Sequence, residues 1–457
     1  MTTISSRNAI ATLRAELTGR LVLPSDATYE ADRAVLYGGI DKRPAAIARV
    51  ANAADVARAV RAARDNGLEL AVRSGGHSIA GHSLSDGGLV IDLRDLKAIK
   101  IDANAKTAWA DAGVTAGELT NATLPHGLAV GFGDTGSVGI SGITLGGGIG
   151  YLSRLHGLTI DKLLAAEVVT ATGDVLIADA QNHADLFWAL RGGGGNFGVV
   201  TRLCYRLEPL SDFTGGLLVL PATAETVSGF MAAAAAAPDA LSAIANVMPA
   251  PPMPFLPADT TGKLIILAMM AYAGDAGAAQ QALAPFRALA MPLADMVAPG
   301  PYTNMFPPED PDYHPTACSR SIFMRGVDHA VADRIVTALT ISDAVFSVVQ
   351  LRTLGGAIAR VPADATAFAH RSAPILANVA AFYTTPEDRK VRDAFVASLS
   401  EELADGLAGS YVNFVGAEGQ GRIAAIYPET TLNRLRQVKK QYDPENLFRL
   451  NQNIEPA

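Results

Sequence analysis

Two glycine-dense segments constrain this chain more than any other feature of its sequence. The first, Ser74-Gly75-Gly76-His77-Ser78, directly follows an apolar run typical of a β-strand. The second contains nine glycines between residues 131 and 150, interspersed with serine and threonine hydroxyls. Backbone without Cβ atoms can curl and aim several N–H groups at one point, which forms a nest for phosphate. Glycine clusters also occur as plain turns, but two such segments in one chain favour a long polyanionic ligand such as a dinucleotide.

Length and composition indicate a folded protein with several structural units. The 457 residues exceed one ordinary domain of roughly 100–200 residues, so two or three units are expected. Hydrophobic residues make up 49% and charged residues 18%, as in a globular chain. The net charge of -8, without a Lys/Arg run, argues against nucleic acid as a partner. No apolar stretch approaches the ~20 residues that span a bilayer, so no membrane partner is expected.

The cysteine count and the N-terminus bear on the compartment. Only two cysteines occur, Cys204 and Cys318, so we expect neither a disulfide framework nor a four-cysteine zinc site, and no metal site is predicted. The first seven residues lack the apolar core of a signal peptide. We therefore expect a cytoplasmic protein, either a monomer or a homodimer.

Hydrophobic periodicity predicts an α+β chain. An apolar run at 46–50, a helical stretch at 54–66 and a second run at 68–72 form a strand–helix–strand unit. From about residue 211 the character changes, because longer Ala-rich helical stretches alternate there with apolar strands and Pro-rich loops. The predicted parts are a first domain over residues 1–210, a second over 211–410 and a C-terminal segment over 411–457.

A third glycine cluster raises the possibility of a different nucleotide site. Gly193, Gly195 and Gly198 match the spacing G-x-G-x-x-G of the Rossmann fold. That site needs a strand before the glycines and a helix after them, so that the helix N-terminus meets the pyrophosphate. Here a predicted helix at 183–191 comes first and a predicted strand at 198–207 follows. The order is reversed, and an NAD site of the Rossmann type is rejected.

Taken together, these motifs resemble the berberine-bridge-enzyme group of the vanillyl-alcohol-oxidase superfamily, whose members have a PCMH-type FAD-binding domain. The segments 73–78, 86–88 and 91–93 resemble the flavin-attachment loop of the group, and 138–158 resembles its second flavin loop. Further matches follow in order at an adenine-side segment, a substrate-domain signature and a C-terminal closure, at residues 185–201, 355–371 and 442–449. The resemblance spans about residues 40–455.

The resemblance implies an FAD cofactor between two α+β subdomains of the first domain, followed by a substrate domain with an antiparallel sheet covered by helices. The 8α-methyl carbon of the flavin would be joined to His77, whose neutral imidazole is a nucleophile. A histidine beside glycines is otherwise an ordinary loop residue. The C-terminal segment would return to the first domain and contact the isoalloxazine. The other residues expected to contact the cofactor are Arg73, Ser74, Gly75, Gly76, Ser78, Gly81, His82, Thr135, Gly136, Gly139, Gly142, Gly146, Gly147, Gly150, Tyr151, Gly198, Val200, Asn451 and Asn453.

One departure from the group concerns a second covalent bond. Many members also hold the flavin through a cysteine three residues before the Val-Gly of the second loop. Thr135 stands at that position here, and both cysteines lie elsewhere. A second bond is therefore excluded by residue type, and FAD held by His77 alone is expected.

Candidates for catalysis come from the C-terminal segment. Tyr411 and Asn413 stand at the place of a Tyr-x-Asn motif of the group, and Tyr427 precedes the last predicted helix. A tyrosine needs a lowered pKa to act as a base near neutral pH, and a structural role is the alternative for both tyrosines. The candidates for the substrate pocket, each with a purely structural alternative, are Tyr302, Met305 and His370.

The reaction that the resemblance implies is removal of a hydride from an alcohol or amine carbon of a small organic substrate. Dioxygen would then be reduced to hydrogen peroxide, with FAD carrying the electrons. Alternatives are a flavin dehydrogenase or an oxygenase of secondary metabolism, a sugar oxidase, and a non-catalytic binding protein. An aromatic content of 6% favours a small apolar substrate over an oligosaccharide, and intact Gly75, Gly76 and His77 argue against a non-catalytic protein.

Overall fold

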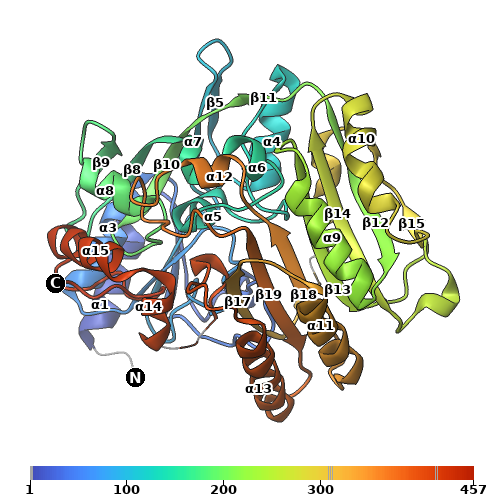
Figure 1. Ribbon diagram of the computed structural model, residues 1–457. Helices are drawn as coiled ribbons and strands as arrows, with labels where there is room; N and C mark the ends of the chain where they lie inside the picture. The colour runs from blue at the N-terminus through green and yellow to red at the C-terminus, as the bar shows by residue number, and fades with distance from the viewer. Residues whose placement is uncertain (1–3, 307, 309, 311, 417, 419) are drawn as a thin grey trace.

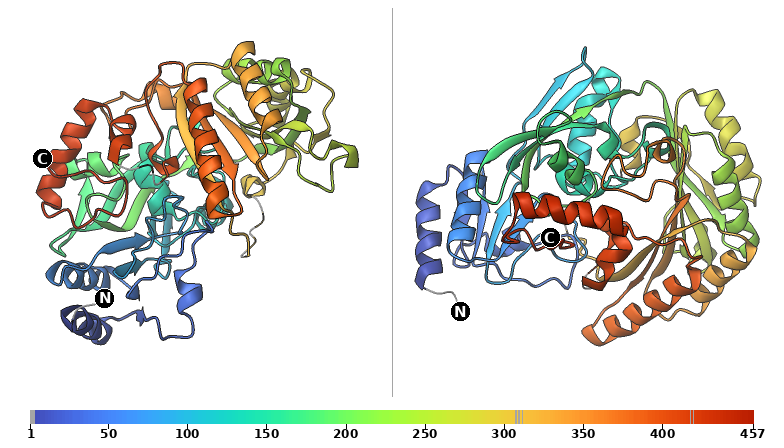
Figure 2. Two further views of the ribbon diagram at one scale, coloured as in Figure 1. Left: turned by 90° about the horizontal axis from the view of Figure 1, so that it is seen from below. Right: turned by 60° about the vertical axis from the view of Figure 1, so that its left-hand side comes forward.

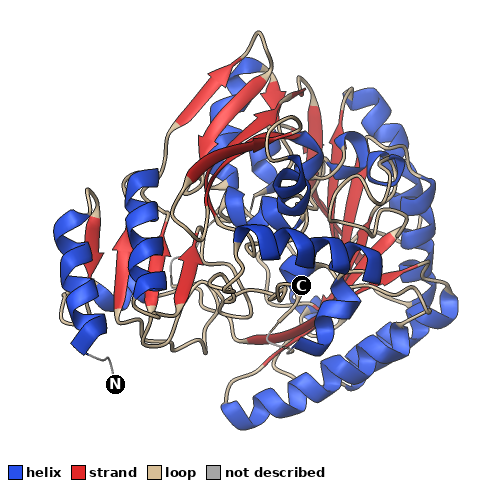
Figure 3. Cartoon of the chain, turned by 90° about the vertical axis from the view of Figure 1, so that its left-hand side faces the viewer, coloured by secondary structure: helices blue, strands red, loops and turns tan. Residues whose placement is uncertain are grey.

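The structure, a computed structural model, describes residues 4–306, 308, 310, 312–416, 418 and 420–457. Its helices and sheets lie in groups around a central region made largely of loops (Figures 1 and 3). This mixture of helices and predominantly antiparallel sheets confirms the predicted α+β class. None of the helices in the described ranges has the length and apolar character needed to cross a bilayer.

A four-stranded sheet in the described part of the chain contains the predicted strand–helix–strand unit. Strands β2 and β3 run parallel to β4, whereas β1 is antiparallel to β2. Helix α3 (Ala53–Asp65) begins after Asn52, whose side chain accepts a hydrogen bond from the Asp55 amide, and its apolar face packs on the sheet. The first glycine segment begins where β3 ends. The strand order is β1 (Arg20–Val22), β2 (Ala46–Arg49), β4 (Leu89–Asp92) and β3 (Leu70–Arg73), with α1 (Ile4–Glu16) and α2 (Tyr29–Arg33) nearby in the chain.

A second sheet, which has five strands within the described ranges, is wholly antiparallel. Its order is β5 (Ile99–Asp102), β6 (Thr107–Asp111), β10 (Val199–Arg206), β8 (Leu163–Val169) and β9 (Val175–Asp179). Helix α8 (Ala184–Leu190) precedes the third glycine cluster and β10 follows it, which is the order that argues against a Rossmann site. The short elements around this sheet are α4 (Ala116–Thr123), β7 (Leu128–Ala129), α6 (Ser153–His156), α7 (Thr159–Lys162) and β11 (Glu208–Pro209).

The second glycine segment contains a helix that the sequence did not predict. Its glycines favour backbone that can curl around a ligand, but Ile140–Gly146 forms a short helix, α5. The reason is burial, because Ile140, Thr144 and Leu145 of this helix face the core. Tertiary packing of one apolar face thus outweighs the poor helix propensity of Gly142.

The large sheet of the described chain has eight strands and two distinct faces. One face packs under α9 (Ala224–Ala236), α10 (Ala276–Arg287), α11 (His329–Ile341) and α13 (Pro386–Leu403), which lie on the outside of the molecule (Figures 1 and 2). On the other face, polar side chains such as Gln350 and Arg352 face the cavity side, whereas another part is apolar and includes Val219, Ile265 and Leu267. Its strands are β15 (Ala294–Asp295), β12 (Phe213–Pro221), β14 (Leu264–Ala273), β13 (Leu241–Pro249), β18 (Ser347–Thr353), β19 (Ile375–Phe382) and β17 (Ala317–Met324), with β16 (Ala298–Pro299) beside β12 and the helix α12 (Ala357–Arg360) after β18.

The C-terminal segment packs against the first half of the chain. Helices α14 (Ile423–Ile426) and α15 (Glu429–Tyr442), with Phe448 and Ile454, share one apolar core with residues between Leu13 and Leu207. Figure 2 shows this red segment lying against the green and blue parts of the chain. The domain boundaries at residues 210 and 411 remain predictions.

Candidate active site

A cavity of about 500 Å³ lies where both glycine segments, the large sheet and the C-terminal segment meet. Its volume is in the range of small-molecule and cofactor sites. Tyr411 and Asn413, predicted as catalytic, contribute to its wall. The predicted cofactor residues that line it are Ser74, Gly75, Gly76, His77, Ser78, His82, Thr135, Gly139, Gly142, Gly198, Val200 and Asn451.

The first two glycine segments touch backbone to backbone. A Cβ atom at Gly75 would lie 2.4 Å from the backbone nitrogen of Gly139. A Cβ atom at Gly139 would in turn lie 2.0 Å from Ser74 Oγ. Only glycine at both positions allows this approach. The contact joins the two segments that the sequence predicts to hold a diphosphate into one wall of the cavity.

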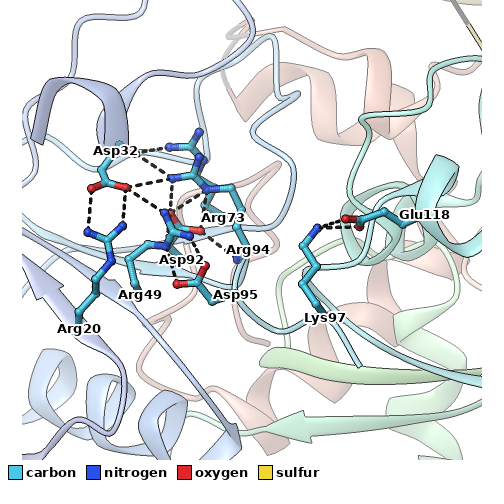
Figure 4. Close-up of polar contacts among 9 residues, drawn as sticks. All are labelled: Arg20, Asp32, Arg49, Arg73, Asp92, Arg94, Asp95, Lys97 and Glu118. Carbon is cyan, nitrogen blue, oxygen red and sulfur yellow. Dashed lines mark hydrogen bonds and ion pairs between the residues drawn. The ribbon is translucent and has the colours of Figure 1, made fainter. Parts of the chain in front are cut away.

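A cluster of charged residues lies behind the first glycine segment (Figure 4). Arg73 is buried, and its Nη1 donates to the carbonyl oxygen of Asp32 at 2.6 Å. Its Nε has no hydrogen-bond partner among the described residues, and a Cβ atom on Gly76 would lie 3.2 Å from it. Four arginines face three aspartates in this cluster, so one positive charge is left over, which favours an anion at the loop. The members are Arg20, Arg49, Arg73 and Arg94 with Asp32, Asp92 and Asp95.

His77 has the protonation state that a nucleophile needs. Burial lowers its pKa below the ordinary value, although a hydrogen bond with the Ser137 backbone and the charge of Asp134 oppose this shift. Burial also lowers the pKa of His82 to about 4. The imidazole of His77 is therefore neutral near pH 7 and faces the cavity.

Sulfur is absent from the cavity wall as far as the described residues form it. Cys204 is buried on β10 and Cys318 on β17, and neither lines the cavity. Thr135 does line it. The described wall thus offers an imidazole but no thiol for covalent attachment of a cofactor.

Tyr411 and Asn413 hold the second glycine segment in place. The Tyr411 hydroxyl accepts hydrogen bonds from the Gly148 amide and from Asn413 Nδ2, each at 2.9 Å. A Cβ atom on Gly146 would lie 2.0 Å from Asn413 Oδ1, so this glycine makes room for the contact. Burial raises the pKa of Tyr411, although these hydrogen bonds oppose the rise. A raised pKa is the opposite of what a base needs, so the contacts favour the structural alternative for Tyr411.

Replacing Tyr411 with phenylalanine distinguishes the two roles. Loss of the hydroxyl leaves the Gly148 amide without its partner, which should lower the free energy of unfolding by about 1–3 kcal/mol. Loss of a general base would instead slow turnover by about 10²–10⁴-fold. Urea unfolding and kcat, measured with the exposed Tyr313→Phe as control, should show the stability effect and a kcat loss below that range. A 10³-fold loss of kcat at unchanged stability would contradict the structural role.

The remaining predicted residues lie outside the described cavity wall. The Tyr427 hydroxyl donates to the Gly192 carbonyl at 3.1 Å, and His370 Nε2 lies 2.8 Å from the Ile426 carbonyl oxygen. Tyr302 and Met305, predicted for the substrate pocket, are instead buried in a separate apolar cluster with Tyr151. Their apolar surfaces are therefore used for packing. The others are Arg73, Gly81, Gly136, Gly146, Gly147, Gly150 and Asn453.

Sequence reasoning missed the wall that the large sheet contributes. Gln350 and Arg352 on β18 face the cavity, whereas Val349 and Leu351, which alternate with them, pack under the helices. This alternation of polar and apolar residues was the available signal. Other missed residues of the wall come from several parts of the chain, and one of them is a carboxylate in the second glycine segment. They are Tyr37, Asp134, Ser319, Asn378 and Phe414.

The cavity fits the FAD that the sequence resemblance implies. The two glycine loops of its wall approach each other closely, an excess positive charge lies behind the first loop, and a neutral imidazole faces inward. The buried Oδ1 atoms of Asn451 and Asn378, which both line the cavity, have no hydrogen-bond partner in the described protein. Such atoms are costly unless a ligand or water satisfies them. No group of His, Cys, Asp and Glu suited to a metal ion occurs among the described residues.

Comparison with known proteins agrees with this geometry. Residues 44–179 match the family model described as FAD binding domain, and 410–455 match the one described as berberine and berberine like. The chain is 30% identical to an uncharacterized FAD-linked oxidoreductase of Bacillus subtilis, covering 97% of this chain and 98% of that protein. It is also 30% identical to (R)-6-hydroxynicotine oxidase of Paenarthrobacter nicotinovorans, covering 96% and 97%.

A solved structure extends the likeness to three dimensions. The crystal structure of 6-hydroxy-D-nicotine oxidase from Arthrobacter nicotinovorans superimposes with a TM-score of 0.86 at 27% identity, covering 97% of this chain and 99% of that one. The order and spacing of the sequence motifs resemble the same enzyme. The chain is an enzyme that belongs to the berberine-bridge-enzyme-like family of FAD-linked oxidoreductases.

Proposed function

We propose that this enzyme is an oxidase that takes a hydride from an alcohol or amine carbon of a small organic molecule and passes the electrons to dioxygen. Its FAD is attached through His77 alone. The observation that carries the proposal is the neutral His77 imidazole beside two touching glycine loops, in a cavity wall that contains no described thiol. Bound FAD supplies the two-electron acceptor.

The chain's own residues have separate tasks in this scheme. The loop at Ser74–Ser78 and the segment around Gly139 hold the diphosphate, with Arg73 and its neighbours supplying positive charge behind them. Tyr411 and Asn413 fix the backbone next to the cavity. The polar face of β18 and β19 orients the substrate, and the apolar residues of the wall exclude water.

Reoxidation of the enzyme tests the choice of oxidase. Protein reduced anaerobically with dithionite and then mixed with air-saturated buffer should regain its yellow colour within seconds and form one hydrogen peroxide per flavin. Slow return of the colour over many minutes would favour the flavin dehydrogenase. With an oxidisable substrate present, an oxygenase would form less than one hydrogen peroxide for each flavin that is reoxidised.

A further inference from the structure

Two side chains of opposite charge meet at the cavity from distant parts of the sequence. Asp134 belongs to the second glycine segment, and Arg352 lies on β18 of the large sheet. Among the described residues that line the cavity, they are the only carboxylate and the only guanidinium or ammonium group. Arg352 Nη2 donates to Asp134 Oδ2 at 2.5 Å.

The Arg352 side chain is held rigidly. Its Nε donates to Gln350 Oε1 at 2.8 Å, and Gln350 Nε2 donates to Asn246 Oδ1 on the neighbouring strand β13, also at 2.8 Å. Its guanidinium lies over the Phe414 ring, 5.0 Å from the centroid. The side chain is only 5% exposed. A charged group held in this way provides a fixed electrostatic field at the cavity.

The ion pair has unused hydrogen-bonding capacity. Arg352 Nη1 makes no hydrogen bond to any described residue, although it is a strong donor. Within the described part of the chain, Asp134 Oδ1 accepts only a long hydrogen bond, 3.3 Å, from Thr135 Oγ1. The pair thus keeps one donor atom and one weakly used acceptor atom for a ligand.

The chemistry of this pair distinguishes among ligand groups. A hydroxyl group matches it, because its oxygen accepts while its proton is donated. A protonated amine would meet the guanidinium at close range, and a carboxylate would meet Asp134. Each of these contacts between like charges is unfavourable where solvent screening is weak.

We propose that the Asp134–Arg352 pair binds the hydroxyl group of an alcohol substrate, with Arg352 Nη1 donating to its oxygen and Asp134 accepting its proton during oxidation. This inference rests on the proposed oxidase function and narrows it to alcohols. The C–H bond breaks and its electron pair leaves with the hydrogen as hydride to FAD. The O–H proton goes to Asp134, and the C–O bond becomes C=O, so the product is an aldehyde or ketone. The hydride, the proton and dioxygen together account for hydrogen peroxide.

The guanidinium makes this step feasible with a carboxylate as the acceptor. Negative charge develops on the substrate oxygen as its proton leaves. A fixed cation beside that oxygen stabilises the charge without reorganisation, which reduces the need for a strong base. Asp134 and Arg352 are therefore assigned to proton acceptance and to charge stabilisation, respectively.

A binding experiment tests the assignment without turnover. The probe is 4-nitrophenol, a hydroxyl compound whose yellow anion is easily distinguished from the neutral form, added to the flavin-containing protein and followed by difference spectroscopy. The unaltered protein should bind the neutral phenol, because its anion would meet the Asp134 carboxylate. Arg352→Gln should weaken binding of the phenol by about 10- to 100-fold, the value of a charge-assisted hydrogen bond. Asp134→Asn should shift the bound probe toward its anion.

The matched control is Arg360→Gln. Arg360 forms an ion pair with Asp239 at the surface, away from the cavity, and its substitution should leave probe binding unchanged. Failure of 4-nitrophenol to bind to the yellow protein would overturn the inference. Equal binding of the phenol by the Arg352→Gln variant would overturn it as well.

A kinetic experiment with alcohols and amines of similar shape provides the second test. Alcohols should be oxidised in preference to amines, and Asp134→Asn should lower kcat by about 10²–10⁴-fold with KM changed only a few-fold. Unchanged turnover in this variant, or oxidation of amines alone, would overturn the inference and leave the oxidase intact. A protein without flavin or without oxygen uptake would instead contradict the proposed function.

Discussion

Replacing Gly139 with alanine is expected to abolish flavin binding and to lower the free energy of unfolding by about 1–3 kcal/mol, the usual range for overpacking. The new methyl group would occupy the space of Ser74 Oγ and of the Gly75 backbone nitrogen. Both belong to the other glycine loop, so the two loops must separate. The ratio of flavin to protein absorbance and urea unfolding of the purified variant measure the two effects.

Gly326→Ala is the matched control for this prediction. No heavy atom of the described chain lies within 4 Å of the position that its Cβ would take, so the variant should keep its flavin and its stability. Circular dichroism separates a folded but colourless Gly139→Ala protein from an unfolded one. A yellow Gly139→Ala protein with full flavin content would show that the contact between the loops does not form the site.

Replacing Lys439 with methionine should have the largest effect on stability, about 3–5 kcal/mol. The side chains of Lys439 and Asp443 are both 0% exposed, and Lys439 Nζ donates to Asp443 Oδ2 at 2.6 Å. Without the ammonium group, the Asp443 carboxylate remains buried with no opposite charge. Burial lowers the pKa of Lys439 itself, as expected for an ammonium group held away from water.

The Lys439 substitution should also disturb the cavity wall. Lys439 Nζ also donates to the carbonyl oxygen of Asn196, and Asn196 Nδ2 donates to the carbonyl oxygen of Gln452, which like Asn196 lines the cavity. Lys440, the next residue, is exposed, so Lys440→Met is the control. The free energies of unfolding of Lys439→Met and Lys440→Met, measured in urea, should differ by most of the predicted loss. Equal unfolding midpoints for the two variants would contradict a structural role for the buried pair.

Much of the fold was predictable because the local sequence of these segments favours the structure that they adopt. The run at residues 89–91 is apolar, and its strand lies in the middle of its sheet, so this strand could be predicted from composition. The helix at Ala53–Asp65 carries its own cap and a regular apolar face. The glycine segments were recognisable because close approach of backbone depends on a missing Cβ atom, which is written directly in the sequence.

The rest depended on contacts between distant residues. Asp134 and Arg352 are 218 positions apart and look like surface residues when each is considered alone. Tyr302 and Met305 stand in a Pro-rich loop that resembles a pocket wall, but their burial beside Tyr151 became visible only in three dimensions. Helix α5 formed in a glycine-rich segment because tertiary burial outweighed local propensity.

The mass of the His77 peptide tests the central claim most directly. Acid-precipitated protein should remain yellow, and after proteolysis the peptide containing His77 should carry the added mass of one FAD. The His77→Ala protein should release its flavin into the supernatant on the same treatment. An unmodified His77 peptide from yellow protein, or flavin that stays bound to the chain in His77→Ala, would contradict the attachment proposed for this site.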